Sequence, residues 1–337
     1  MVLTPIFRHR SPLLVPFQDT FDIAQFAKIT QTAELKEFKR ECGSMVKVVL
    51  MGPHTRQDLF SEMSRNYKKL KKKYLAKFGI TLPSDATVPS TDEDARERLE
   101  SSANETCVGV FISYSYVHQS TLLNGMGLPM NATADIATSV DRHLKRVPTI
   151  TSVADAVKDS ICEGKPYLAL HWRNKTGEQC SSKRKTSLIN PVNCRKFLSS
   201  LTKAGDKFAS DVSDIMSIHN LSCIYVAYLP YSKEIIDMLS RRIEDISTAA
   251  DILEAADTSS VSAVLTDEYM FSLVEQEICY RAEVFIGSMW SNWANFVASE
   301  FESEDRPVYY LLGVRGSLVE PVANITISRD SDGVPRP

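Results

Sequence analysis

The chain has 337 residues, of which 43% are hydrophobic and 24% charged, and this composition is typical of a folded globular protein. Its net charge of −3 gives no sign of a nucleic-acid partner or an anionic membrane surface, and no apolar run is long enough to span a bilayer. A chain of this length has room for two domains of ordinary size.

Glycosylation motifs and the amino terminus point to different compartments. The first residues lack the apolar core of a signal peptide, which taken literally indicates a cytosolic protein. Sequons for N-linked glycosylation occur at Asn104, Asn131, Asn174, Asn220 and Asn324. This number exceeds what we expect by chance, and it favours the secretory pathway.

The seven cysteines show no spacing typical of a metal site. An odd number leaves at least one thiol free, unless it pairs with another chain. Cys223 and Cys279 lie in apolar runs, so we interpret them as core residues. Cys162, Cys180 and Cys194 flank loops, and we expect a disulfide among them if the compartment is oxidising.

The first half of the chain predicts two strands separated by long polar or basic segments. Short apolar runs favour strands over residues 46–51 and 108–114. A helix is predicted over residues 57–78, and we interpret its lysine cluster as a solvated face rather than an anion-binding patch. Residues 82–103 are rich in Ser, Thr, Pro, Asp and Glu, which indicates a surface insertion or a disordered loop.

The second half alternates between apolar strands and amphipathic helices. Strands are predicted over residues 167–170, 223–229, 262–265, 284–286 and 308–312. Helices are predicted over residues 194–218 and 290–301, and after the capping residues Ser152, Ser232 and Asp267. Strands that alternate with helices favour right-handed crossovers and a parallel sheet, so the fold class is α/β.

A histidine and an arginine follow the first of these second-half strands. Side chains alternate along a strand, so His171 and Arg173 point to one side and Trp172 to the other. Ligands of open α/β sheets bind outside the carboxyl ends of the strands, and a guanidinium there suits a phosphate. The alternative is that Arg173 pairs with a nearby carboxylate and that His171 is a hydrogen-bonded core histidine.

A second pattern is a strand that runs into Gly287 and is followed within a few residues by a helix. The unpaired N–H groups of that helix's first turn, with the hydroxyls of Ser288 and Ser291, form a potential anion site. The alternative is that Ser288 only caps the helix.

Together the two patterns resemble the donor-binding half of the GDP-fucose protein O-fucosyltransferases. That family has a strand ending in His-x-Arg, an acidic residue on a later helix, and a strand ending in Phe-Ile-Gly before a Ser-Ser-Phe-like triplet. The corresponding segments here are His171-Trp172-Arg173, Glu275, Phe285-Ile286-Gly287 and Ser291-Asn292-Trp293. The resemblance runs from about Leu13 to Gly313 and leaves out the insertion.

The resemblance implies two Rossmann-like domains facing across a cleft, as in GT-B glycosyltransferases. We expect an acceptor-side domain over residues 1–150, a GDP-fucose-binding domain over residues 151–315, and a tail over residues 316–337. The family's Gly-Arg-Phe-Gly-Asn-Gln-like loop, which contributes to the donor site, has no counterpart in this chain. We therefore expect the amino-terminal domain to be incomplete.

The resemblance also implies a reaction: inverting transfer of fucose from GDP-fucose to a hydroxyl of a protein or glycan, in the lumen of the endoplasmic reticulum or Golgi. No metal or other cofactor is required in the family, so none is expected here. Arg173 is the expected catalytic residue, because it would neutralise charge on the departing β-phosphate. The expected donor-binding residues are His171, Arg173, Glu275, Ser291, Asn292 and Trp293.

Three points stay open at this stage. The nearest candidate for a general base is Glu178, with a plain solvated glutamate as the alternative. A degenerate, non-catalytic family member that binds GDP-fucose or a protein partner is the second hypothesis. A third is another nucleotide-sugar transferase or a sulfotransferase, which would prefer a different nucleotide.

Overall fold

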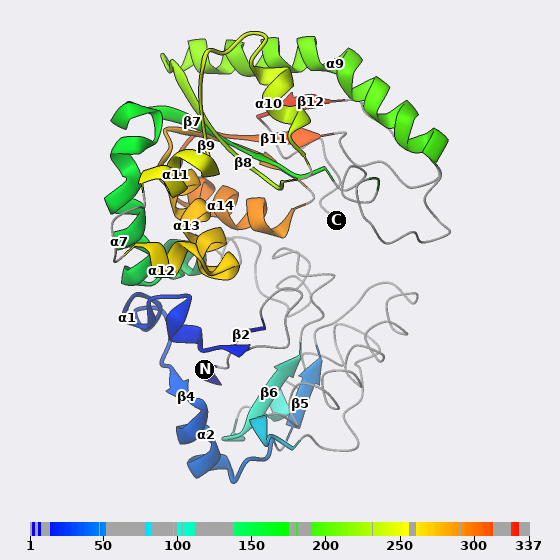
Figure 1. Cartoon of the computed structure of the whole chain (residues 1–337). Coiled ribbons are helices and arrows are strands. Elements are labelled where there is room, and N and C mark those ends of the chain that lie inside the picture. Colours follow the sequence, from blue (N-terminus) through cyan, green and yellow to red (C-terminus); the bar gives the residue numbers. More distant parts are fainter. Residues whose placement is uncertain are drawn as a thin grey trace. The chain divides into compact units, whose positions relative to one another are not determined.

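The chain folds into two compact units. The computed structural model (Figure 1) describes residues 2–3, 6–7, 14–46, 48–51, 78–81, 97, 100–102, 104–111, 138–174, 180, 191–230, 232–255, 261–289, 291–312 and 325–329. The first unit comprises Met1–Ile6, Ile23–His143 and Pro335–Pro337, and the second comprises Phe7–Asp22 and Leu144–Val334. In the described part of the chain, no helix combines the length and apolarity needed to cross a membrane.

The described part of the first unit contains two short parallel strand pairs. Its elements are β1 (Val2–Leu3), α1 (Ile23–Phe26), β4 (Ala33–Glu34), α2 (Leu35–Cys42), β5 (Val48–Met51) and β6 (Val108–Phe111). Strand β1 pairs in parallel with β4, and β5 with β6. The two strands predicted in this half are therefore confirmed over the residues that the structure describes. A disulfide between Cys42 and Cys107 joins the end of α2 to the start of β6.

Helix α2 begins at a local network of hydrogen bonds. A capping box forms at its start, in which the N–H of Glu34 donates to Glu37 at 2.8 Å. Apart from Phe78, the predicted helix over residues 57–78 lies outside the described residues. Most of the insertion over residues 82–103 and most of the tail also lie outside them.

The second unit is built on a six-stranded sheet with the order β12-β11-β10-β7-β8-β9. The strands are β7 (Tyr167–Trp172), β8 (Cys223–Tyr228), β9 (Asp245–Thr248), β10 (Val284–Ser288), β11 (Val308–Leu312) and β12 (Thr326–Ser328). All neighbours are parallel except β12, which is antiparallel to β11. The chain adds β8 and β9 on one side of β7 and then returns to the other side for β10, so the strand order reverses between β7 and β10.

Helices cover both faces of this sheet (Figure 1). They are α7 (Pro148–Val157), α9 (Pro191–Ile218), α10 (Glu234–Leu239), α11 (Ala249–Ala255), α12 (Ser262–Leu265), α13 (Glu268–Arg281) and α14 (Asn292–Ser303). Helices α9 and α10 pack against one face, which we call the α9 face. Helices α7, α11, α12, α13 and α14 pack against the other, the α13 face.

The side chains of β7 alternate between the two faces as predicted. Leu168, Leu170 and Trp172 belong to the core of the α9 face, whereas Ala169 belongs to the core of the α13 face. Because both faces are covered, the strand is an almost continuous apolar run. This burial fixes the register of the strand end that follows.

The structure corrects one predicted strand. Residues 262–265 form helix α12, and the strand before it is β9, which the sequence did not predict. Strand β9 is an edge strand of the parallel part of the sheet, and Asp245, Ser247 and Thr248 are three of its four residues. An edge strand needs little apolar surface, so the hydrophobic pattern that marks the other strands is absent from it.

The helix starts are partly as predicted. Asp267 caps α13 by accepting the N–H groups of Tyr269 and Met270. Ser152 and Ser232 do not act as caps, because α7 already begins at Pro148 and α10 follows Lys233. Proline is preorganised for the first helical position, and this effect determines where α7 begins.

The cysteines form three disulfides. Besides the pair in the first unit, Cys180 bonds to Cys194 and Cys162 bonds to Cys223. The expected loop disulfide is therefore found, but the interpretation of Cys223 as a core thiol was wrong, because the turn after α7 brings Cys162 to the start of β8. Cys279 is free and buried as predicted, and burial raises the pKa of its thiol.

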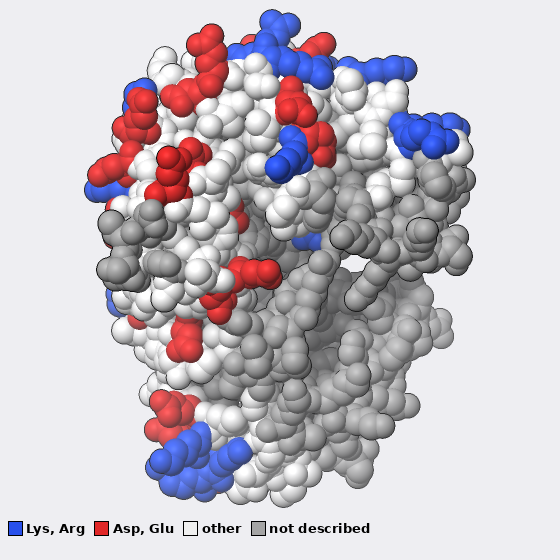
Figure 2. All heavy atoms as spheres, in the orientation of Figure 1, with Lys and Arg blue, Asp and Glu red and all other residues white. Residues whose placement is uncertain are grey.

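Charged side chains of both signs are spread over the surface. On the face in Figure 2, acidic side chains lie mainly over α7, α11 and α12, and basic ones lie along α9 and over α2. The described part of this face therefore carries no broad field of one sign, in keeping with the small net charge.

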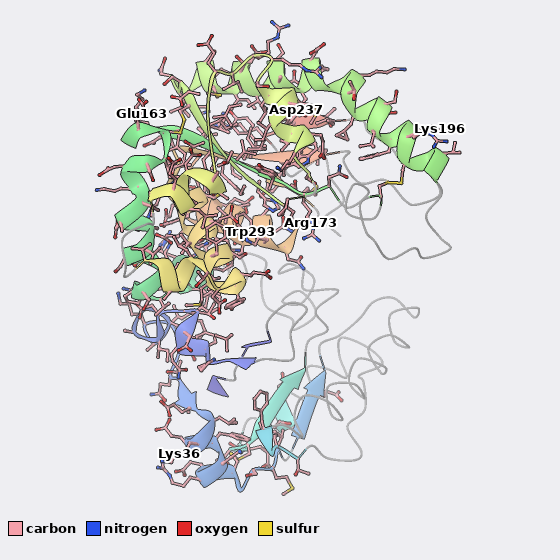
Figure 3. All side chains as sticks on the ribbon, viewed as in Figure 1. Lys36, Glu163, Arg173, Lys196, Asp237 and Trp293 are labelled. Carbon is pink, nitrogen blue, oxygen red and sulfur yellow. A yellow bond between two sulfur atoms is a disulfide. The ribbon has the colours of Figure 1, made fainter. Side chains whose placement is uncertain are left out.

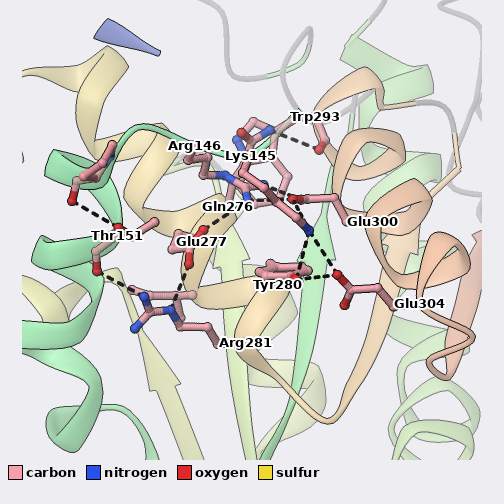
Figure 4. A network of polar contacts seen from close by, with 12 residues as sticks. Lys145, Arg146, Thr151, Gln276, Glu277, Tyr280, Arg281, Trp293, Glu300 and Glu304 are labelled. Atoms are coloured by element: carbon pink, nitrogen blue, oxygen red, sulfur yellow. Dashed lines mark hydrogen bonds and ion pairs between the residues drawn. The ribbon is translucent and has the colours of Figure 1, made fainter. Parts of the chain in front are cut away.

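A buried ion network joins the segment before α7 to α13 and α14 (Figure 4). The guanidinium of Arg146 donates to both carboxylate oxygens of Glu300, at 2.7 and 3.2 Å, and to Glu277 at 3.2 Å. The side chains of Arg146 and Glu300 are fully buried. Lys145 binds Glu304 at 3.0 Å beside this pair. Removing one member of such a network leaves an uncompensated charge in the interior.

Replacing Arg146 with alanine should lower the free energy of unfolding of the second unit by about 3–5 kcal/mol, because the buried Glu300 loses the guanidinium that binds both its oxygens and keeps only Lys145 at 3.8 Å. Urea unfolding followed by tryptophan fluorescence measures this unit alone, since the three tryptophans all lie in it. The control is Arg241→Ala, which breaks an exposed pair with Asp206 and should cost less than about 1 kcal/mol. Equal losses for the two variants would contradict the expectation.

Candidate active site

The carboxyl ends of β7 and β10 lie side by side where the strand order reverses. In the register of these strands His171 is opposite Gly287, so Arg173 and Ser288 follow at adjacent strand ends. Ligands of open α/β sheets bind outside the carboxyl ends of the strands at such a reversal. The two sequence patterns, far apart along the chain, therefore meet at the position of the sheet that favours ligand binding.

The glycine in β10 lets helix α14 pack closely on the sheet. A Cβ atom at Gly287 would lie 2.9 Å from Cε1 of Phe285 and 3.4 Å from Cβ of Ala294. Neither contact can be relieved easily, since Phe285 is fully buried and Ala294 is part of α14. The small residue thus holds the start of α14 beside the strand ends.

The hydroxyl of Ser288 links the two strand ends instead of facing a ligand. It accepts the backbone N–H of Arg173 at 2.9 Å and donates to the carbonyl of His171 at 2.8 Å. Its expected contribution to an anion site is therefore not observed. Its alternative role as a helix cap is also not observed, because the N-cap of α14 is Ser291.

His171 stacks on Trp293, the second residue of α14. The ring centroids are 4.4 Å apart with an angle of 21° between the planes. Burial, with a further contribution from the charge of Arg173, lowers the pKa of His171 to about 3. The imidazole is therefore neutral at physiological pH, and its Nδ1 has no hydrogen-bond partner among the described residues. This unsatisfied nitrogen argues against the interpretation of His171 as a hydrogen-bonded core residue.

Trp293 is held in place by helix α13. Its indole Nε1 donates to the hydroxyl of Ser272 at 2.9 Å, and its carbonyl accepts from Nε2 of Gln276 at 3.2 Å. Neither Ser272 nor Gln276 was predicted from the sequence. Their i, i+4 spacing on a helix was the available signal, but it has meaning only once the partner helix is known.

Arg173 immediately follows β7 and is partly exposed. Its guanidinium is close enough to His171 to contribute to the lowered pKa of that ring, so both side chains share one region, as strand alternation predicts. Figure 3 shows Arg173 and Trp293 at the same end of the sheet. A cation, a neutral imidazole and an indole ring therefore lie together there.

The start of α14 adds backbone donors. Ser291 has an extended backbone, is buried and makes no side-chain cap hydrogen bond, while Asn292 after it is exposed. The N–H of Ser291 donates to the carbonyl of Ser288 at 2.9 Å. The first N–H groups of a helix have no partner within the helix and favour an anion.

Glu275 lies on α13, between the two residues that hold Trp293. It accepts the hydroxyl of Tyr225 on β8 at 3.0 Å. Burial raises the pKa of Glu275 to about 7, and the hydrogen bond from Tyr225 opposes this rise only in part. The structure thus places a readily titrated carboxyl group on the same helix face as Ser272 and Gln276.

Two expectations are not tested here. Glu178, the candidate general base, lies outside the described residues. Within the residues that the structure describes, no group of three or more His, Cys, Asp or Glu side chains forms a possible metal site. Metal independence stays a prediction.

Comparison with known proteins places the chain in a family. The GDP-fucose protein O-fucosyltransferase family matches residues 2–304, and the chain belongs to that family. It is therefore a glycosyltransferase of the fucosyltransferase class by descent and fold. No curated protein sequence matches the chain at a significant level.

Solved structures of POFUT1 share the fold. One in complex with GDP has a TM-score of 0.52 and 16% identity, covering 89% of this chain and 85% of that chain. One in complex with GDP-fucose has a TM-score of 0.53 and 15% identity, covering 92% and 88%. At this identity the likeness shows the mixed α/β, GT-B-like fold with an open, mostly parallel sheet.

Proposed function

We propose that this chain transfers fucose from GDP-fucose to a hydroxyl of a protein or glycan, with inversion and without a required metal. Its family supports the donor and the group transferred. The observation that carries the proposal is the register of β7 and β10, which brings His171 and Arg173 beside the start of α14 at the reversal of strand order.

Arg173 is the residue proposed to act on the departing diphosphate. When the bond between fucose and the β-phosphate breaks, negative charge grows on the phosphate oxygens. A guanidinium and the first N–H groups of α14, which begins after Ser291, would stabilise that charge. The acceptor hydroxyl would attack from the opposite face of the sugar, which gives inversion. We assign no general base among the described residues.

The remaining donor contacts are proposed from the surroundings of each group. Neutral His171 and Trp293 form a rigid stacked pair that offers a surface to the nucleotide. Glu275 is proposed to accept hydrogen bonds from the guanine edge, which carries adjacent N–H donors. Because the carboxylate is the form that accepts both hydrogen bonds, its raised pKa makes donor binding sensitive to pH.

The proposed location is the lumen of the endoplasmic reticulum or Golgi. Three disulfides support it, because disulfides persist mainly in oxidising compartments. Two of the sequon asparagines, Asn104 and Asn220, are exposed and available for modification. Asn174 is fully buried, and its Nδ2 donates to Glu234 at 2.9 Å.

A non-catalytic relative that binds GDP-fucose or a protein partner is the alternative. The experiment on Arg173 below decides between the two, since binding of GDP by the parent without turnover of GDP-fucose would favour the alternative.

Affinity for GDP-fucose should rise roughly tenfold between pH 6 and pH 8, because the ionised fraction of a carboxyl with a pKa of about 7 rises by that factor. GDP-fucose is the suitable ligand, since its diphosphate does not titrate in this range, and His171 with a pKa of about 3 stays neutral throughout. Calorimetry measures the affinity. The variant Glu275→Gln should bind more weakly and lose the pH dependence; a pH dependence that persists in this variant would show that another group titrates.

Replacing Arg173 with lysine or alanine should reduce turnover of GDP-fucose by about a hundred- to a thousandfold. Lysine keeps the charge but loses the planar fork that binds two phosphate oxygens. Release of GDP measures turnover, and the melting temperature on the same preparation should change little. Arg241→Lys is the matched control at an ion pair outside the site. A destabilised but fully active Arg173→Lys would instead indicate a structural ion pair.

Secreted from cells with an added signal peptide, the protein should carry N-glycans on Asn104 or Asn220 and none on Asn174. A glycan on Asn174 would require its buried side chain to leave Glu234. N-glycosidase converts each glycosylated asparagine to aspartate, and mass spectrometry of the released peptides then locates the sites that carried a glycan. Complete absence of glycans would count against the proposed compartment, and occupancy of Asn174 would contradict the described strand end.

A further inference from the structure

Arg173 lies between two residues whose side chains bind the same carboxylate. The indole Nε1 of Trp172 donates to Oε1 of Glu234 at 3.4 Å, and Nδ2 of Asn174 donates to the same oxygen at 2.9 Å. Trp172 and Asn174 are both fully buried. Glu234 is partly exposed and is the first residue of α10, the helix after β8. A carboxylate from a neighbouring element thus fixes the residues on either side of Arg173.

The opposite side of the same segment is fixed by β10. The hydroxyl of Ser288 binds the backbone at His171 and at Arg173. Residues 171–174 are therefore held from the β10 side through backbone atoms and from the α10 side through side chains. Strand β7 ends within this segment, so the ladder of the sheet no longer determines its conformation. Glu234 and Ser288 supply that constraint instead.

We propose that Glu234 is a positioning residue for Arg173. It holds Arg173 in place indirectly, through the hydrogen bonds that Trp172 and Asn174 donate to it. The inference rests on the proposed function, in which Arg173 binds the diphosphate of the donor. A displacement of about 1 Å in a group that must meet phosphate oxygens is enough to lose much of its effect. Both donors share one oxygen of Glu234, so the amide oxygen of a glutamine can replace it.

The test is calorimetric titration of the whole chain with GDP. The variant Glu234→Ala should bind GDP about tenfold more weakly than the parent, while Glu234→Gln should recover most of that loss. Asp237→Ala, on an exposed carboxylate of the same helix (labelled in Figure 3), is the matched control and should bind like the parent. A role in stability alone predicts a lower melting temperature for Glu234→Ala with normal GDP affinity.

A double-mutant cycle tests the proposed route through Arg173. If Glu234 acts through Arg173, then Glu234→Ala should weaken GDP binding in the parent but not in an Arg173→Ala background. Additive losses of GDP affinity in the double variant would overturn the inference. A Glu234→Gln variant that binds GDP as weakly as Glu234→Ala would also overturn it. If Glu234→Ala does not fold, the variant Asn174→Leu is tested in its place, because the leucine side chain has a similar volume but no N–H group to donate to Glu234. Normal GDP affinity in that variant would also overturn the inference.

Failure of the inference and failure of the proposed function give different results. If Arg173→Ala itself binds GDP like the parent, the proposed function fails and the inference with it. If Arg173→Ala binds weakly while Glu234→Ala binds normally, only the inference fails.

Discussion

The hydroxyl of Ser288 connects two strand ends that are far apart in the sequence. It accepts from the backbone of Arg173 and donates to that of His171, and so joins β10 to β7 at the reversal of strand order. The absence of a side chain at Gly287 lets α14 approach the same point. The positions of the guanidinium of Arg173, the neutral imidazole of His171 and the first turn of α14 all depend on this junction between β7 and β10. A change that separated β7 from β10 would therefore remove the whole site at once.

Helix α13 carries two nearby carboxyl groups that have different partners. Glu277 is paired with Arg146 and Arg281, and it belongs to the network that secures the helix layer. Glu275, two residues earlier, has a tyrosine hydroxyl as its hydrogen-bond partner, and burial raises its pKa to about 7. A buried carboxyl group without a cation is costly to ionise, and such groups cluster at functional sites. The same helix thus stabilises the unit at one position and supplies a titrating group at another.

The sequence alone predicted the strand ends that carry His171, Arg173 and Gly287, because buried parallel strands are continuous apolar runs that are easy to recognise. It missed β9, whose polar residues suit an edge strand. It also missed the bond between Cys162 and Cys223, because a pairing across two elements depends on the tertiary fold. The sequence did not indicate Ser272, Gln276 or Glu234 for the same reason, because each of them acts through a contact with a residue distant in the chain. Hydrophobic periodicity locates the elements, whereas such contacts arise only from how the elements pack.

The central claim is that the donor nucleotide binds at the junction of β7, β10 and α14. Hydrogen–deuterium exchange with and without saturating GDP tests it most directly, because amide protection reports the site without requiring turnover or a known acceptor. The account predicts that GDP, but not UDP, slows exchange at residues 171–174 and 291–295. Protection by GDP confined to other segments, or equal protection by UDP, would contradict it.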